Sequence, residues 1–278
     1  MKTILLVILG AVLWGWNVGA VPLDTGTFTE IIQQVDTLAA ADSAATPARV
    51  NEIVKAPERV RTGPSSRAEI TAPDQTIIRV GANTVFSFAG GSRTVNLDQG
   101  SLLFHAPKGI GGGIIKSGGA AAAVLGTTLI VVATTNGGFK VIFLEGKGAA
   151  TLPNGRSVKL KAGQLVYVLP GQTQFSPVFN IDLGRLTASS LLVQGFDHEL
   201  SSAPLIAQAV QQQQSEIASG GLSDPSTTFD NTGFVPGGPG TSQDPNTVQI
   251  GTVTQTPPPA PGGLYPVKPP APPHPPAP

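Results

Sequence analysis

The sequence from Lys116 to Val168 alternates short runs of β-branched and aromatic residues with glycine-containing turns, and no other feature restricts the fold as strongly. The clearest runs are 127–132, 139–145 and 164–168. Val, Ile, Thr, Phe and Tyr favour strands, whereas Gly and Asn favour tight turns. We therefore expect consecutive short strands here, with a hairpin turn at Asn154-Gly155.

The same pattern begins further upstream, near Arg67. Strand-like runs occupy 68–70, 76–80, 85–88, 94–97 and 101–105. Strand signals at intervals of about 8–12 residues predict an all-β sandwich, barrel or roll. No amphipathic helix interrupts the series, so parallel βαβ units are not expected. Because aromatic residues make up only 5% of the chain, Val, Ile, Leu and Ala must form most of the core.

The N-terminus has the features of a secretory signal peptide. A positive start at Met1-Lys2 precedes an apolar run that ends at Trp16, and small residues follow in Val18-Gly19-Ala20. We expect cleavage after Ala20. An uncleaved anchor is the alternative, although the run is shorter than the roughly 20 apolar residues of a membrane span. The chain has no cysteine, which excludes disulfides, thiolate metal sites and cysteine nucleophiles.

The C-terminal part changes in composition. Residues 171–196 have weak strand character. Ser201–Ser219 is the best predicted helix. Its apolar face consists of Leu205, Ile206 and Val210, and its glutamine run at 211–214 is expected to be polar and exposed. From Gly220 onward the chain is rich in Gly, Ser, Thr and Pro, which predicts a disordered, proline-rich tail. The predicted organisation is a signal peptide (1–20), an all-β domain (25–170), an extension with a C-terminal helix (171–219) and the tail (220–278).

Six short motifs, in this order, resemble the FecR family. They are Arg61-Thr62-Gly63 with Ser66-Arg67-Ala68-Glu69, Arg79-Val80-Gly81-Ala82-Asn83-Thr84, Asp98-Gln99-Gly100, Val124-Leu125-Gly126-Thr127, Leu144-Glu145-Gly146 and Leu160-Lys161-Ala162-Gly163. The resemblance covers roughly Phe28–Val168. It implies a twisted, solenoid-like β-roll of short strands outside the cytoplasmic membrane, with 28–38 as a first strand and not a helix.

The resemblance also implies a class of function. Founding members of the family sense an outer-membrane receptor in the periplasm and signal through a membrane helix to a cytoplasmic sigma factor. This sequence has a signal peptide where those proteins have a cytoplasmic region, so we expect only the extracytoplasmic module to carry over. The expectation is an exported, non-enzymatic protein, periplasmic or secreted, that binds or senses a partner in the bacterial cell envelope. A structural envelope or matrix protein and a carbohydrate-binding module are the alternatives.

No pattern in the sequence indicates catalysis. The histidines His105, His198 and His274 lie far apart, so no metal site is expected. The glycine-rich run 109–117 lacks the glycine before its lysine and the following helix of a phosphate loop, which predicts a flexible loop instead. There is no Gly-x-Ser-x-Gly motif. The acids expected to be embedded in the fold are Glu69, Asp74, Asp98 and Glu145, and they do not suggest a glycosidase pair. We expect no catalytic residue and no cofactor.

Charge gives the one hint of a binding surface. Residues 49–161 hold fourteen Lys and Arg against six Asp and Glu, so the body is basic although the chain is neutral overall. Arg156, Lys159 and Lys161 cluster around one hairpin, and the two lysines share a face because they are two positions apart. We expect them to meet an anionic partner, either lipopolysaccharide, an acidic glycan or an acidic protein, unless they only solvate the surface. Export argues against nucleic acid.

Overall fold

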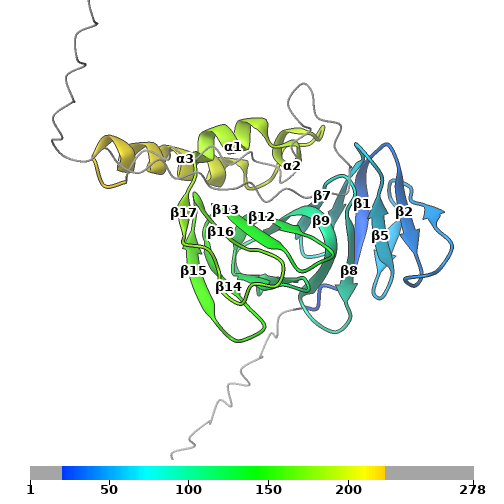
Figure 1. The fold of residues 1–278 in the computed structure, drawn as a ribbon. Helices are drawn as coiled ribbons and strands as arrows, with labels where there is room; N and C mark the ends of the chain where they lie inside the picture. Colours follow the sequence, from blue (N-terminus) through cyan, green and yellow to red (C-terminus); the bar gives the residue numbers. More distant parts are fainter. Residues whose placement is uncertain (1–20, 223–278) are drawn as a thin grey trace, which may run out of the picture.

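The computed structural model describes residues 21–222, which form seventeen strands and three helices (Figure 1). The strands are β1 (Thr25–Ile32), β2 (Val35–Leu38), β3 (Thr46–Pro47), β4 (Ile53–Lys55), β5 (Arg59–Thr62), β6 (Arg67–Thr71), β7 (Ile77–Val80), β8 (Val85–Ala89), β9 (Thr94–Ala106), β10 (Gly113–Lys116), β11 (Ala121–Val124), β12 (Thr127–Ala133), β13 (Phe139–Glu145), β14 (Lys147–Thr151), β15 (Ser157–Lys161), β16 (Gln164–Val168) and β17 (Phe179–Asn180). The helices are α1 (Leu183–Ser189), α2 (Leu191–Gln194) and α3 (Ala203–Ala218).

The strands form two layers that share the long strand β9. The upper layer has the order β4-β1-β6-β7-β9-β12-β13-β16-β17. The lower layer has the order β3-β2-β5-β8-β9-β10-β11-β14-β15. Every pairing is antiparallel except that of β9 with β10. Within residues 21–222 the sheet is open, because β15 and β17 each pair on one side alone.

A glycine allows β9 to pass from one layer to the other. Residues up to Gln99 pair with β8 in the lower layer, and residues from Gly100 onward pair with β12 in the upper layer. Gly100 has φ +92°, a conformation that residues with a Cβ rarely adopt. A Cβ at Gly100 would also lie 2.2 Å from Oγ1 of Thr84. The Asp98-Gln99-Gly100 motif is therefore required by the bend.

Two apolar clusters hold the layers together. The first fills the space between the two sheets, and the second lies between the upper sheet and the helices. Strand β12 contributes to both, because alternate side chains point to opposite faces: Leu129 and Val131 face inward, whereas Ile130 and Val132 face the helices. The buried side chains are mainly Val, Ile, Leu, Phe and Ala, as the composition predicts.

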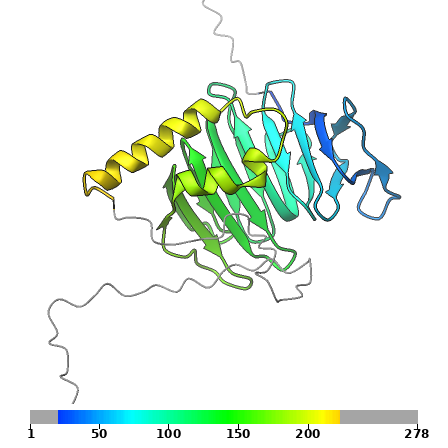
Figure 2. The same cartoon turned by 90° about the horizontal axis from the view of Figure 1, so that it is seen from above.

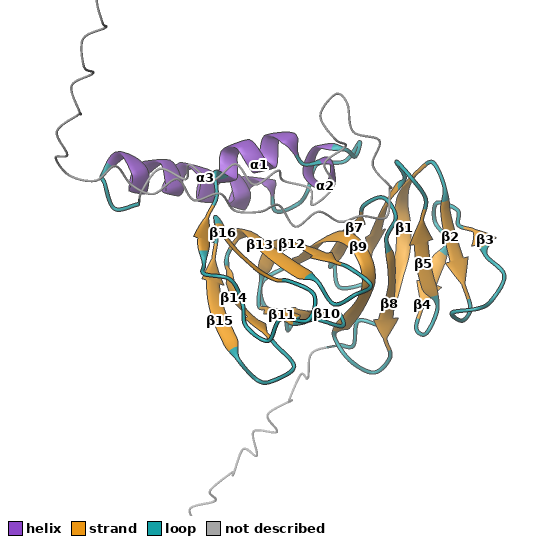
Figure 3. Ribbon diagram, viewed as in Figure 1, coloured by secondary structure: helices purple, strands orange, loops and turns teal. Residues whose placement is uncertain are grey.

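The helices lie across the outer face of the upper sheet (Figure 2). The carboxylate of Asp182 caps α1 by accepting a hydrogen bond from the backbone N–H of Arg185 at 2.9 Å. Ile206 of α3 is buried against this face, together with Leu183 and Leu186 of α1. Figure 3 shows that all helix of the described chain lies in this one layer. No helix within residues 21–222 is long and apolar enough to span a membrane.

The predicted all-β class is confirmed, and so is the helix at 201–219, which the structure places at Ala203–Ala218. Residues 28–38 are strand and not helix, as the resemblance implied, but they form two strands, the end of β1 and all of β2, which lie in different layers. Helices α1 and α2 were not predicted from the sequence. The roll-like winding and the limits of the domains stay predictions. The signal peptide and the tail lie outside the described residues.

The glycine-rich run 109–117 is more ordered than predicted. Its second half, Gly113–Lys116, is strand β10, which pairs with β9 and β11. A Cβ at Gly113 would lie 2.4 Å from Cζ of Phe104. The glycine is therefore required by close packing on an aromatic ring, and the prediction of a flexible loop was wrong for this half.

Candidate functional site

The three predicted surface residues lie on strand β15 and at the turn that precedes it, at the edge of the lower sheet. Lys159 and Lys161 are exposed and share a face, as predicted, because Leu160 between them is buried. Arg156 lies at the turn before the strand, where Gly155 has φ +83° and donates its N–H to Leu152 O at 2.9 Å. The register pairs Lys147 of β14 with Lys161, so a fourth exposed cation joins this face.

An edge strand with several lysines has a structural explanation as well. Exposed edges can pair with other chains, and lysine side chains oppose this by placing charge along the edge. β15 pairs only with β14 among the described strands, so it is such an edge. Its lysines therefore protect the sheet whether or not they also bind a partner.

A groove lies between this hairpin and helix α3. Its volume is about 440 Å³, within the range of roughly 300–1,000 Å³ that is usual for ligand sites. The residues that line it come from the ends of β13 to β15, from the loops after β9 and β11, from β17, and from α3 and the residues after it. They include Lys108, Leu125, Glu145, Lys147, Lys161, Leu205, Gln208, Ala209, Gln213, Glu216 and Leu222. Of the three predicted residues, only Lys161 lines this groove.

Helix α3 is fixed beside the groove by a buried glutamine. Gln213 accepts a hydrogen bond from the N–H of Leu183 at 3.0 Å and donates one to Ile181 O at 2.7 Å. It thus supplies partners for backbone groups at the start of α1. The sequence predicted an exposed glutamine run, which was wrong for this residue, since only 9% of Gln213 is exposed. Gln213 lies seven positions after Ile206, a spacing that places both residues on the same face of the helix, so the sequence did contain a sign of its burial.

A buried polar chain lies below the groove. The hydroxyl of Thr128 donates to Oε1 of Glu145 at 2.9 Å, and Nδ1 of His105 lies 2.9 Å from the same hydroxyl. Burial raises the pKa of Glu145 and lowers the pKa of His105. The His105 side chain is only 5% exposed, and its contact with Thr128 makes it part of the structure.

The acidic residue Glu216 lies on the helix side of the groove. Its carboxylate accepts hydrogen bonds from Gln212 at 3.0 Å and from Nζ of Lys161 at 3.2 Å. The Gln212 amide, followed by Lys161, holds the pKa of Glu216 below its usual range. Lys161 is therefore already paired within the chain.

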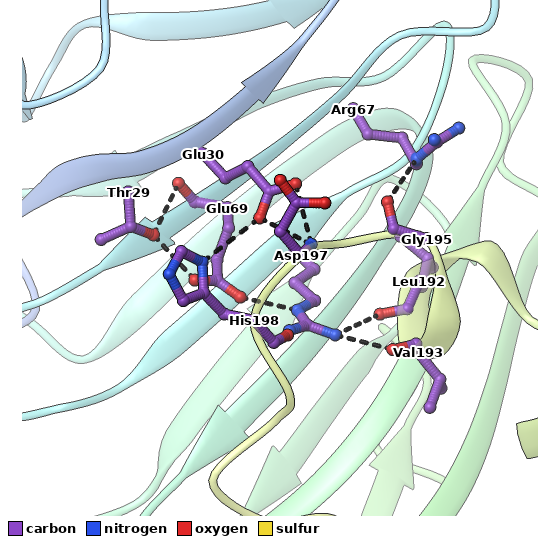
Figure 4. Close-up of polar contacts among 10 residues, drawn as sticks. Thr29, Glu30, Arg67, Glu69, Leu192, Val193, Gly195, Asp197 and His198 are labelled. Carbon is purple, nitrogen blue, oxygen red and sulfur yellow. Dashed lines mark hydrogen bonds and ion pairs between the residues drawn. The ribbon is translucent and has the colours of Figure 1, made fainter.

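The opposite end of the helical layer is held by a buried arginine, Arg79, whose partners Glu69, Leu192 and Val193 are labelled in Figure 4. Nε of Arg79 donates to Oε2 of Glu69 at 2.7 Å, and its side chain is fully buried. Its other nitrogens donate to the carbonyls of Leu192, Val193 and His198. The guanidinium also lies over the Phe196 ring, 4.5 Å from its centre.

Neighbouring polar contacts reinforce this arrangement, which we call the arginine clamp (Glu69, Arg79 and the segment 192–198). Thr29 donates to Oε1 of Glu69 at 2.8 Å, and Nε of Arg67 donates to Gly195 O at 3.3 Å. The carboxylate of Glu30 accepts the N–H of Asp197 at 3.1 Å (Figure 4). The Arg67-Ala68-Glu69 and Arg79-Val80-Gly81 motifs were identified from the sequence only as part of the family resemblance. Sequence reasoning missed that they hold a segment more than a hundred residues away.

The described residues contain no cluster of three or more metal-binding side chains. The sequence matches no curated protein. Two crystal structures of a proposed anti-sigma factor from Parabacteroides distasonis, at 1.65 and 2.50 Å, are similar to the chain at 21% identity, with TM-scores of 0.42 and 0.43. They cover 47% and 49% of this chain, which spans 63% and 64% of theirs.

The family comparison gives the clearer result. The model described as FecR protein matches residues 58–147, from the loop before β5 to the first residue of β14. The match contains both motifs of the arginine clamp and one side of the groove. The resemblance seen in the sequence is confirmed for residues 58–147, which match the FecR domain.

Proposed function

We propose that this protein is an exported, non-enzymatic FecR-domain protein that binds a protein partner in the bacterial cell envelope and takes part in signalling. The observation that carries the proposal is the FecR match over residues 58–147. Proteins of this family are regulatory and associated with the envelope, and no other feature of the described chain points to a different role. The signal-peptide pattern of residues 1–20 supports export.

The geometry supports an adaptor more than a catalyst. The acids and the histidine of the described body are used for structure: Glu69 holds Arg79, and Glu145 and His105 both bond to Thr128. The charged side chains at the groove that remain exposed without a salt bridge in the described chain are Lys108 and Lys147. Such a surface binds and orients, and it offers no nucleophile with an activating base.

In-cell crosslinking tests this proposal. The full-length chain, tagged at its C-terminus, is treated with an amine-reactive crosslinker in intact cells, and the products are identified by mass spectrometry. We expect one envelope protein to dominate, and we expect its product to vanish when residues 2–20 are deleted, because the protein then stays inside the cell. Deleting the gene is expected to change transcript levels of a defined set of genes.

Other outcomes would contradict the proposal. Self-crosslinks alone, with no change in transcripts, would favour a structural envelope or matrix protein. Attachment to glycan alone would favour a carbohydrate-binding module or a site for acidic glycan or lipopolysaccharide on Arg156, Lys159 and Lys161.

A further inference from the structure

The groove beside α3 combines charge with apolar contact, and this combination restricts what can occupy it. Three lysines line it: Lys108, Lys147 and Lys161. Lys161 is bonded to Glu216, but Lys108 and Lys147 are exposed and form no salt bridge with any residue in 21–222. Two cations are therefore available to an incoming anion.

The acidic residues of the groove offset the positive charge of its lysines only in part. Glu216 is engaged with Lys161 and Gln212. Glu145 is only 4% exposed and accepts the hydroxyl of Thr128, so it presents little of its charge to the opening. Lys108 attracts the Glu145 carboxylate without contacting it within salt-bridge distance. The accessible face of the groove is thus basic.

Two leucines give the groove apolar contact points. Leu125 follows β11 and is 76% exposed, which is the largest value among the large apolar side chains of residues 21–222. Leu205 faces the groove from α3 and is 36% exposed. Single exposed leucines are common on protein surfaces, but these two line the same groove and therefore offer an apolar contact area beside the cations.

This combination distinguishes between classes of anion. An acidic glycan or a phosphate group would use the lysines and leave both leucines in water. A protein segment with carboxylates and apolar side chains can use both, and each buried methylene contributes about 0.8 kcal/mol. The volume of about 440 Å³ suits a few side chains and not a folded domain.

We propose that this groove binds an acidic segment of a partner protein, with carboxylates at Lys108 and Lys147 and an apolar side chain between Leu125 and Leu205. The proposal rests on the proposed function, because it specifies where and how the envelope partner binds. Arg156 and Lys159 lie beyond the groove on the same hairpin and steer the acidic segment toward it.

Peptide binding tests the chemistry. The probe is a fluorescein-labelled peptide with two leucines among Asp and Glu residues, measured by anisotropy against the full chain. One matched peptide carries Asn and Gln in place of the acids, and another carries Ala in place of the leucines. We expect saturable binding of the first peptide, and binding about tenfold or more weaker for each of the others. Equal binding by the alanine peptide would overturn the proposal in favour of a general anion surface.

Matched protein variants test the location. The groove pair Lys108→Glu/Lys147→Glu is compared with the control pair Lys55→Glu/Lys116→Glu, which changes the net charge equally at exposed strand residues outside the groove. All four side chains are exposed, so folding is expected to be unaffected. We expect the groove pair to weaken peptide binding about tenfold or more and the control pair to change it by less than about twofold. Equal losses would overturn the proposal.

Photo-crosslinking in cells separates this proposal from the proposed function. A photoreactive residue is placed at Gln208, which lines the groove, or at Gln211, which is exposed on the same helix outside it. We expect the envelope partner to crosslink from position 208 and not from position 211. If the amine-reactive reagent captures the partner but position 208 never does, the groove is not the binding site, whereas the proposed function is still supported. Crosslinks from 208 to residues 223–278 of the chain itself would also overturn the proposal.

Discussion

The two ends of the helical layer use charged residues in opposite ways. At the α2 end, Arg79 is fully buried and bonds to Glu69 and to three carbonyls. At the α3 end, Lys108 and Lys147 are exposed at the rim of a groove and form no salt bridge within the described chain. A buried charge is tolerated only when it is paired, because it has lost its hydration. An exposed charge stays hydrated and needs no partner within the chain.

The comparison indicates that the α2 end stabilises the fold and that the α3 end is the candidate binding site. The clamp joins residues 67–79, inside the FecR match, to residues 192–198, outside it. It thereby fixes the start of the helical layer on the sheet. Helix α3 continues from this anchor and forms one wall of the groove. Loss of the clamp should therefore damage the groove, but changes in the groove should leave the clamp intact.

The largest effect is expected from Arg79→Met. The change leaves the Glu69 carboxylate and several carbonyls without their buried partner, so we expect the free energy of unfolding to fall by about 3–5 kcal/mol. Urea denaturation followed by circular dichroism measures this. The double variant Glu69→Gln/Arg79→Met should lose less than the single one, because no uncompensated charge remains. A loss below about 1 kcal/mol in the single variant would show that the clamp is not structural.

A smaller loss is expected at the other end from Gln213→Leu. The leucine would keep the helix but leave the Leu183 N–H and the Ile181 carbonyl unpaired, which costs about 1–3 kcal/mol for a buried group. Gln211→Leu, on the exposed face, is the control and should change stability by less than about 0.5 kcal/mol. Similar values for both glutamines would mean that α3 is not anchored through Gln213.

The same two ends show how far the sequence alone could lead. The strands, the α3 helix and the turn glycines follow from local patterns, because β-branched runs, helical spacing and positive φ are properties of neighbouring residues. The clamp depends on contacts between residues more than a hundred positions apart in the sequence. The buried role of Gln213 depends on contacts about thirty positions apart. Charge counting found the basic hairpin. It could not show that Lys161 would be paired with Glu216 while Lys108, from a separate loop, would line the same groove.

Helix α1 was missed for a different reason. It has seven residues and includes a glycine and a threonine, so its helical propensity is weak. Burial of Leu183 and Leu186 against the upper sheet stabilises it. The one local signal was Asp182, a favourable N-cap residue three positions before Arg185.

A pH-dependent effect is expected from Glu145→Gln. Burial raises the pKa of Glu145 above its ordinary value of 4.5, so the folded state holds this proton more tightly than the unfolded state does. The wild type should therefore lose stability relative to the variant as pH rises from about 4 toward 7, and the two should converge below about pH 4. Glutamine still accepts the hydroxyl of Thr128.

The measurement is the difference in unfolding free energy between the two proteins across this pH range. His105 contributes in the opposite direction, because burial lowers its pKa and its stabilising effect is lost as pH falls below 6.5. His105 and Glu145 share the Thr128 hydroxyl, so the same comparison is made in a His105→Gln background to separate the two contributions. A variant that becomes less stable than the wild type as pH rises would show that the carboxylate is stabilised by Lys108 and not opposed by burial.

The smallest effect on stability is expected from Lys161→Ala. Its side chain is 57% exposed, and its only salt bridge within residues 21–222 is to Glu216 at the surface, where solvent and salt screen the interaction. The melting temperature should stay within the error of replicate scans. Binding of the acidic peptide should nevertheless weaken, because the groove loses one of its three lysines while Glu216 loses its partner and faces the ligand. A clear fall in melting temperature without a change in peptide binding would show that Lys161 serves stability and not binding, so that both ends of the helical layer would be structural.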